Sequence, residues 1–152
     1  MRPIVANKVD FHFNVGERLH YAARVVRKSR SLGLMSAVYC TDRRRTEAFV
    51  TTLCAFDPTG FYPIVPANDP LAPVTGTVYA NRLEELPDRD VLILLDEQVP
   101  ADFVDQFARF ERIIDIVSAE PEPLEAARAR FSLYRHSSIE PVAHKQGHSH
   151  EH

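Results

Sequence analysis

Arg128 and Phe131 are the residues whose spacing most clearly suggests a binding chemistry. They stand three positions apart in the segment 121–136, where apolar residues recur at the three- and four-residue spacing of one helix face. This spacing places a guanidinium beside an aromatic ring, and Arg130 and Arg135 add positive charge nearby. Because a planar guanidinium binds a carboxylate through two hydrogen bonds, the pair suits a ligand that ends in an apolar side chain and a carboxylate. The same pattern also fits an ordinary amphipathic helix with solvated arginines.

A second candidate for docking lies in the segment 58–73, which contains five prolines and Gly60. Prolines stiffen a backbone and reduce the entropy that is lost on binding, and aromatic side chains supply contact area. Phe61 and Tyr62, followed by Pro63, are therefore candidate anchors for a protein partner. The alternative is that these side chains fold back and cover the core.

Nucleotide chemistry has little support in the sequence. The five glycines form neither a GxGxxG nor a GxxxxGK[ST] motif, and Glu17 places an acid in the first predicted strand-to-helix turn, where a phosphate would lie. Asp96 and Glu97 follow the apolar run 91–95 and could hold Mg²⁺, but without a phosphate loop a capping or solvated turn is the better interpretation. We therefore predict no catalytic residues. A small nucleotide- or phosphate-dependent enzyme is the alternative.

The histidines near the C-terminus could chelate a transition metal, since imidazole binds Zn²⁺, Ni²⁺ and Cu²⁺. They are His144, His148, His150 and His152. A tail without periodicity offers no fixed geometry, so we predict incidental affinity at most, and neither a functional metal site nor a cofactor. Cys40 and Cys54 lack a CxxC spacing and are predicted to be buried thiols.

Strands that alternate with helices must position these candidates. Apolar and alternating runs predict about five strands, at 9–15, 34–41, 74–80, 91–95 and 112–117. Helical spacing and capping residues predict helices that end near Gly33, begin after Asp42, start at Pro100 and start at Pro121. This order favours an α/β fold with a mostly parallel sheet and helices on both faces.

Length and composition limit the kinds of protein that this chain can be. Its 152 residues fit a single domain, which we predict at 1–138, followed by a disordered His-rich tail at 139–152. The formal net charge is -3, which gives no overall electrostatic reason for the protein to bind DNA directly. The sequence leaves open the role of the three consecutive arginines Arg43, Arg44 and Arg45. No apolar run is long enough to cross a bilayer, and the N-terminus lacks the features of a signal peptide. We therefore expect a cytoplasmic protein.

Several segments, taken in order, resemble one known family. They are Phe11-His12-Phe13, Leu53–Asp57, Phe61-Tyr62-Pro63, Val91–Leu95, Phe103–Phe110 leading to Arg112–Val117, and Ala127–Arg135. Over about 11–135, the chain is similar to the chi subunit of the bacterial DNA polymerase III clamp-loader complex. The order and spacing of the segments carry this resemblance together.

The resemblance implies a Rossmann-like domain without a nucleotide-binding loop and a non-catalytic role in DNA replication. Such a subunit would bridge the clamp loader, through the psi subunit, to the acidic, Phe-ended C-terminal tail of single-stranded DNA-binding protein. It would reach DNA only indirectly.

The resemblance also implies roles for individual residues at the tail site. Arg128 would hold the terminal carboxylate of the tail, with Val117 and Phe131 lining the pocket and Arg135 nearby. Leu124 stands where the family can have a Lys, which removes one positive charge from this site.

At the second site, Phe61 with Tyr62 and Pro63 would anchor psi or, in some relatives, a helicase. The chain has Cys54 where the family often has Trp, and Ile64 where it can have His.

Overall fold

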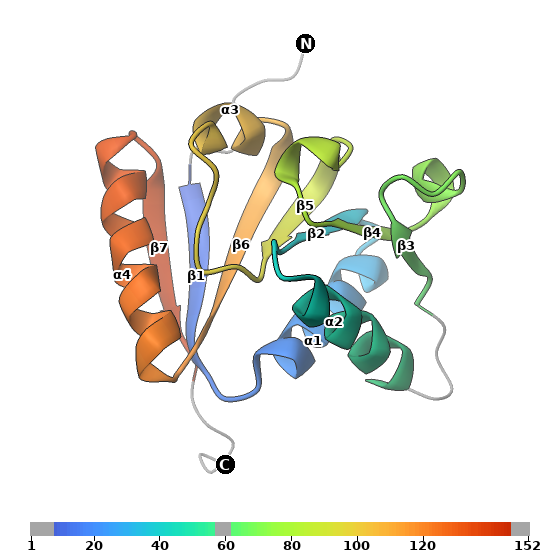
Figure 1. Cartoon of the computed structure of the whole chain (residues 1–152), viewed down its shortest axis with the longest axis horizontal. Helices are drawn as coiled ribbons and strands as arrows, with labels where there is room; N and C mark the ends of the chain where they lie inside the picture. The colour runs from blue at the N-terminus through green and yellow to red at the C-terminus, as the bar shows by residue number, and fades with distance from the viewer. Residues whose placement is uncertain (1–7, 57–61, 147–152) are drawn as a thin grey trace.

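A computed structural model of the chain describes residues 8–56 and 62–146, and these ranges contain a single seven-stranded sheet (Figure 1). The strand order is β3-β4-β2-β5-β6-β1-β7, and every neighbouring pair is parallel. The strands are β1 (Lys8–Val15), β2 (Ser36–Tyr39), β3 (Ile64–Pro66), β4 (Thr77–Ala80), β5 (Arg89–Leu94), β6 (Phe110–Ser118) and β7 (Glu140–Lys145). The predicted α/β fold with a mostly parallel sheet is confirmed, with seven strands rather than about five.

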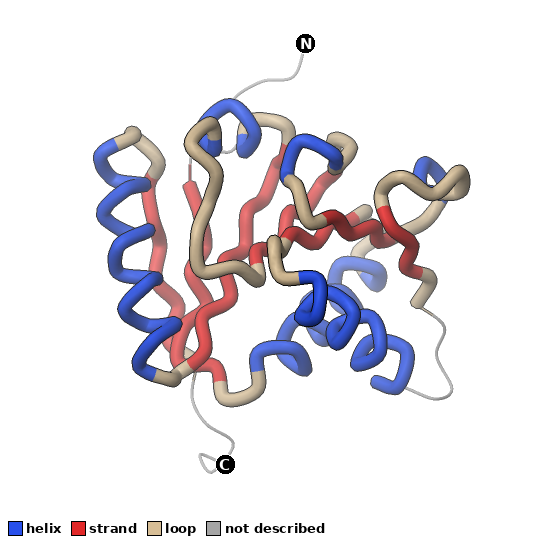
Figure 2. Tube along the Cα trace, in the orientation of Figure 1, coloured by secondary structure: helices blue, strands red, loops and turns tan. Residues whose placement is uncertain are grey.

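Helices connect the parallel strands, as crossover connections require. They are α1 (Arg18–Ser31), α2 (Arg43–Phe56), α3 (Phe103–Phe107) and α4 (Pro121–His136), with short 3-10 turns η1 (Ala72–Val74) and η2 (Leu83–Glu85). Helices α1 and α2 cover one face of the sheet, and α3 and α4 cover the other (Figures 1 and 2). None of the helices in the described ranges is both long and apolar enough to cross a membrane.

Strand β6 shows how the two faces are built. Its side chains alternate, so that Ile113 and Val117 pack in the cluster under α3 and α4, whereas Ile114 and Ile116 pack in the cluster under α1 and α2. The central strands are therefore apolar on both faces, as parallel strands covered by helices must be.

Strand β7 overturns part of the predicted disordered tail. Residues 140–145 pair with residues 8–13 of β1, from Lys8 opposite Glu140 to Phe13 opposite Lys145. Prediction failed because β7 is an edge strand held by backbone hydrogen bonds, so that its side chains need not be apolar. His148, His150 and His152 lie outside the described residues.

Two smaller expectations are also corrected. The proline-rich segment 58–73, which contains none of the five predicted strands, includes the three-residue strand β3. Cys40 is buried as predicted, but Cys54 is exposed, because it lies on the outer side of α2.

Candidate partner-binding site

The pocket that we call the α4 pocket lies between α4 and the adjacent strands β1 and β7, and its volume is about 600 Å³. Its floor is apolar and its rim is polar. The apolar lining comes from Phe11, Phe13, Ala119, Leu124, Ala127, Phe131 and Ala143, and the polar lining from Asn14, Arg128, Ser132 and Lys145. An apolar floor with a few polar groups at its edge is typical of a site that binds an apolar side chain and orients it.

Aromatic packing fixes the floor of the α4 pocket. The ring centroid of Phe11 on β1 lies 5.6 Å from that of Phe131 and 5.5 Å from that of Tyr134, both on α4. These tilted arrangements are favourable for aromatic pairs. Phe131 is only partly buried, so one side of its ring packs on the core while the remainder faces the pocket.

A buried ion pair holds α4 on the sheet. Nε of Arg130 donates to Oδ2 of Asp115 at 2.9 Å, and Nη2 donates to Oδ1 at 2.8 Å. The hydroxyl of Tyr134 donates to the same carboxylate at 3.3 Å, and burial, followed by the charge of Asp115, raises the pKa of Tyr134 well above its usual value. Arg130 was expected to add positive charge to the site. Its charge is instead neutralised inside the protein.

Arg128 has the opposite environment. Its side chain is 70% exposed, and its closest acidic partner is Glu125, one turn earlier on α4, at 3.6 Å. An exposed pair at this distance contributes little energy, so the guanidinium can exchange Glu125 for another carboxylate.

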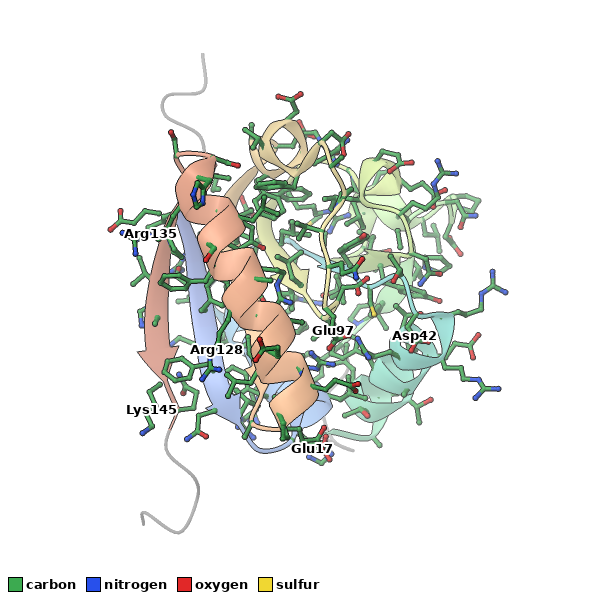
Figure 3. The ribbon with its side chains drawn as sticks, turned by 60° about the vertical axis from the view of Figure 1, so that its left-hand side comes forward. Glu17, Asp42, Glu97, Arg128, Arg135 and Lys145 are labelled. Atoms are coloured by element: carbon green, nitrogen blue, oxygen red, sulfur yellow. The ribbon has the colours of Figure 1, made fainter. Side chains whose placement is uncertain are left out.

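The structure brings two of the four residues predicted for the tail site into one pocket. Arg128 and Phe131 both line it. Val117 lies fully buried in the core cluster under α4, and Arg135 is exposed on α4 but outside the lining of the pocket. Figure 3 shows Arg128 and Lys145 near one end of this side of the molecule and Arg135 nearer the other.

Lys145 and Asn14 line the same pocket and were not predicted as site residues. Lys145 was assigned to the disordered tail, and no periodicity in 140–145 marks it as a strand. Asn14 adopts a positive φ of 64°, which Asn tolerates better than most residues, and its side chain donates to the backbone carbonyl of Gln146 at 2.9 Å.

The segment predicted to anchor a second partner is described only in part, since Phe61 lies outside the described residues. Tyr62 is partly buried and packs against the core cluster under α1 and α2. Pro63 is partly buried and directly precedes β3. Tyr62 therefore follows the alternative interpretation, in which the aromatic side chain helps to cover the core.

A second hollow, which we call the strand-end crevice, lies where β1, β5 and β6 end, and its volume is about 1030 Å³. The carboxylate of Glu97 lines this crevice and forms ion pairs with the guanidinium groups of Arg18 and Arg45, each with an N···O distance of 2.9 Å. Asp96 accepts the backbone N–H groups of Thr41 and Glu97, each at 2.7 Å, which agrees with the predicted capping turn.

In the strand-end crevice, neighbouring charges change the pKa of Glu97. Burial alone would raise the pKa of Glu97, but Arg18 and Arg45 stabilise its carboxylate and lower that pKa overall. Over 8–56 and 62–146, no group of three or more His, Cys, Asp or Glu side chains is arranged to hold a metal ion.

Comparison of folds finds similar solved structures at very low sequence identity. One is the C-terminal domain of the DEAD-box protein Dbp5, with a TM-score of 0.63 and 9% identity over 93% of this chain and 91% of that chain. Another is Dbp5 of S. cerevisiae, solved with Nup159, Gle1, IP6 and ADP, with a TM-score of 0.60 and 9% identity. That match covers 96% of this chain but only 43% of the Dbp5 chain. At this identity, the likeness shows the fold alone.

Comparison of sequences gives a more specific result. No curated protein matches the chain. The family model described as "DNA polymerase III chi subunit, HolC" matches residues 7–141, which is most of the sequence and includes the residues of β1 and α4 that line the α4 pocket, but not Ala143 and Lys145 of β7. The resemblance seen in the sequence is thereby confirmed, and this protein belongs to the family of DNA polymerase III chi subunits, HolC.

Proposed function

We propose that this chi-family protein is a non-catalytic subunit that bridges the clamp loader, through psi, to the C-terminal tail of single-stranded DNA-binding protein. Family membership supports a place in the DNA polymerase III complex. The observation that carries the tail-binding role is the α4 pocket, in which an exposed arginine stands beside a partly buried aromatic floor.

The chemistry of the pocket suits a chain that ends in an apolar residue. The terminal aromatic side chain packs against Phe131 and Leu124 and removes their apolar surface from water. Arg128 then binds the terminal carboxylate through two parallel hydrogen bonds. An internal Phe cannot satisfy both contacts, because its carboxyl group is part of a peptide bond. The pocket therefore selects chain ends.

The energetic balance predicts modest affinity. One buried aromatic side chain contributes roughly 1.5–3 kcal/mol, and a hydrogen-bonded charge pair contributes about 1.5–3 kcal/mol more. Further contacts of the tail bring the expected dissociation constant to the order of micromolar. Binding of this strength suits a tether that must release and rebind as replication proceeds.

The clamp-loader half of the proposal rests on family membership and on the segment 61–63. Tyr62 and Pro63 lie beside β3, at the far edge of the sheet from α4. A partner at that edge and a tail in the α4 pocket would occupy opposite ends of the sheet. One subunit could therefore hold both at once in the cytoplasm and reach DNA only through the DNA-binding protein.

A peptide that ends in Asp-Ile-Pro-Phe tests the tail-binding half by calorimetry on the full chain. We expect binding that weakens as salt rises, and we expect a peptide with a C-terminal amide to bind at least about tenfold more weakly. Arg128→Ala should cause a similar loss. Arg44→Ala, which removes another exposed arginine, from α2, should bind as the unchanged protein does.

Two results would contradict the proposal. One is equal binding of the acid and amide peptides, and the other is equal loss from Arg128→Ala and Arg44→Ala. The clamp-loader half is tested separately, by co-purification of the tagged chain with psi and the clamp-loader subunits.

A further inference from the structure

We infer that Lys145 on β7 reads an acidic side chain upstream of the terminal residue of the bound tail, an inference that rests on the proposed tail-binding function. Arg128 and Lys145 both line the α4 pocket, one from the helix and the other from the edge strand. The pocket thus has a cation on each of two facing walls, and we assign them to two different negative groups of one ligand.

The fold fixes where Lys145 points. Side chains alternate along β7, so that Ala143 and Lys145 face the α4 pocket. His144, between them, faces the other side of the sheet, where its Nε2 lies 2.9 Å from Oδ1 of Asp10. Lys145 therefore belongs to the pocket by the register of β7 and not by the chance position of a flexible end.

Hydrogen bonds on both sides of Lys145 hold the end of β7 in place. The backbone N–H of Gln146 donates to the carbonyl of Phe13 at 2.9 Å, and the side chain of Gln146 donates to the carbonyl of His144 at 3.0 Å. Asn14 donates to the carbonyl of Gln146 at 2.9 Å. The backbone of Lys145 is thus anchored, while its exposed side chain keeps the freedom to follow a ligand.

The charge of Lys145 is available for a ligand. Across the ranges 8–56 and 62–146, no acidic group pairs with Lys145. Figure 3 shows its side chain projecting from the end of β7, on the same side of the molecule as Arg128. The lining of the α4 pocket contains two cations and no acidic residue, which creates a local positive potential although the whole chain has a net charge of -3.

The two cations suit different negative groups. Arg128 lies three residues from Phe131 on α4. When a terminal Phe packs against Phe131, its own carboxylate is therefore the group that the planar guanidinium of Arg128 binds. Lys145 carries a point charge on a flexible stem, which accepts an acidic side chain in several geometries. In an extended peptide, an acid three residues before the end lies roughly 10 Å from the terminal carboxylate, so a single guanidinium cannot bind both groups.

Crossed substitutions in the full chain and the peptide test this assignment. The peptides end in Asp-Ile-Pro-Phe or in Asn-Ile-Pro-Phe, and the protein variants are Lys145→Ala, Lys145→Gln and Arg128→Ala. We expect both Lys145 variants to bind the Asp peptide about threefold to fivefold more weakly at low salt and the Asn peptide almost as the unchanged protein does. Lys145→Arg should restore the preference for Asp.

Matched controls separate a local contact from net charge. Lys8→Ala removes an exposed lysine from β1, five positions from Phe13, at the end of the strand pair far from the pocket. It should leave both affinities unchanged. Arg128→Ala should weaken both peptides by a similar factor, because both retain the terminal carboxylate.

The outcomes distinguish failure of this inference from failure of the proposed function. If the unchanged protein binds neither peptide, the tail-binding function is wrong and the role of Lys145 falls with it. If it binds the Asp peptide, but Lys145→Gln weakens the Asp and Asn peptides equally or not at all, only the assignment of Lys145 is overturned.

Discussion

The α4 pocket and the strand-end crevice both border α4, but they differ in whether their basic side chains are paired with acidic ones. In the crevice, Arg18 and Arg45 are both bound by Glu97. In the pocket, Arg128 has only a weak exposed pair and Lys145 has no acidic partner within the described residues. Parallel α/β sheets commonly bind ligands where their strands end. This chain fills that place with its own ion pairs, and at the edge of the sheet it presents one weakly paired cation and one cation without an acidic partner in the described residues.

The beginning of α4 makes the strand-end crevice still less suited to a phosphate. Helix N-termini bind anions through free backbone N–H groups, but Pro121 and Pro123 have none, and the N–H of Leu124 donates to the carbonyl of Glu120 at 3.1 Å. Glu120 and Glu122 add negative charge there. The comparison therefore favours the docking function over the nucleotide-dependent alternative.

The largest effect should come from Asp115→Ala, which breaks the buried support of the α4 pocket. The side chains of Asp115 and Arg130 are 0% and 4% exposed, so the variant leaves a charged guanidinium without its partner in the interior. We expect the free energy of unfolding to fall by about 3–5 kcal/mol, as measured by urea denaturation.

The double variant Asp115→Leu with Arg130→Met provides the control for that prediction. It removes both charges and should be more stable than Asp115→Ala, because no unpaired charge stays buried. A loss of less than about 1 kcal/mol in Asp115→Ala would show that water reaches Arg130 and that the pair does not hold α4.

Arg128 and Arg130 show how far the sequence could predict this site. They are two residues apart, which places them about 200° apart around a helix. Ala127, Arg130 and Tyr134 share the 3.6-residue spacing of the buried face, so the inward position of Arg130 could have been predicted. Its partner Asp115 could not, because it comes from β6 and only the packing of helix on strand brings the two together.

The central strands could be predicted from their own sequence, whereas the edge strand β7 could not. The run 91–95 is apolar because both faces of β5 are buried, so its sequence reveals its structure. Strand β7 forms because β1 offers a free row of backbone donors and acceptors, and no local pattern records that. Lys145 was not predicted to lie in this pocket for that reason, whereas the spacing of Arg128 and Phe131 on one helix does show that they lie side by side.

Glu97→Gln should have a moderate effect that is confined to stability. The side chain of Glu97 is 29% exposed, and removing its charge from two arginine pairs should lower the free energy of unfolding by about 1 kcal/mol at pH 7. Binding of the Asp-Ile-Pro-Phe peptide in the α4 pocket should not change. Weaker peptide binding would show that the two hollows are coupled through α4.

The pH dependence of that variant has a definite sign. Burial opposes ionisation of Glu97, but Arg18 and Arg45 outweigh it and hold the pKa below the usual 4.5 in the folded state. The carboxylate therefore stabilises the fold above about pH 4.5, and this contribution is lost as the pH falls through the lowered value. The stability difference between Glu97→Gln and the unchanged protein should disappear in acid, as followed by urea denaturation across pH 3–7.

Glu125→Gln should have the smallest effect. It tests whether the pair with Glu125 limits how well Arg128 can bind the carboxylate of a ligand. Glu125 and Arg128 are 79% and 70% exposed, so their pair at 3.6 Å is worth little, but it competes with a bound carboxylate. We expect affinity for the Asp-Ile-Pro-Phe peptide to rise by up to about twofold at low salt, with no change at high salt. Glu122→Gln makes the same change of charge one turn earlier on α4, at a glutamate that also lines the strand-end crevice but does not pair with Arg128. An equal rise in both variants would mean that net charge, and not release of Arg128, controls the affinity, whereas a fall in Glu125→Gln alone would mean that Glu125 orients Arg128 toward the ligand.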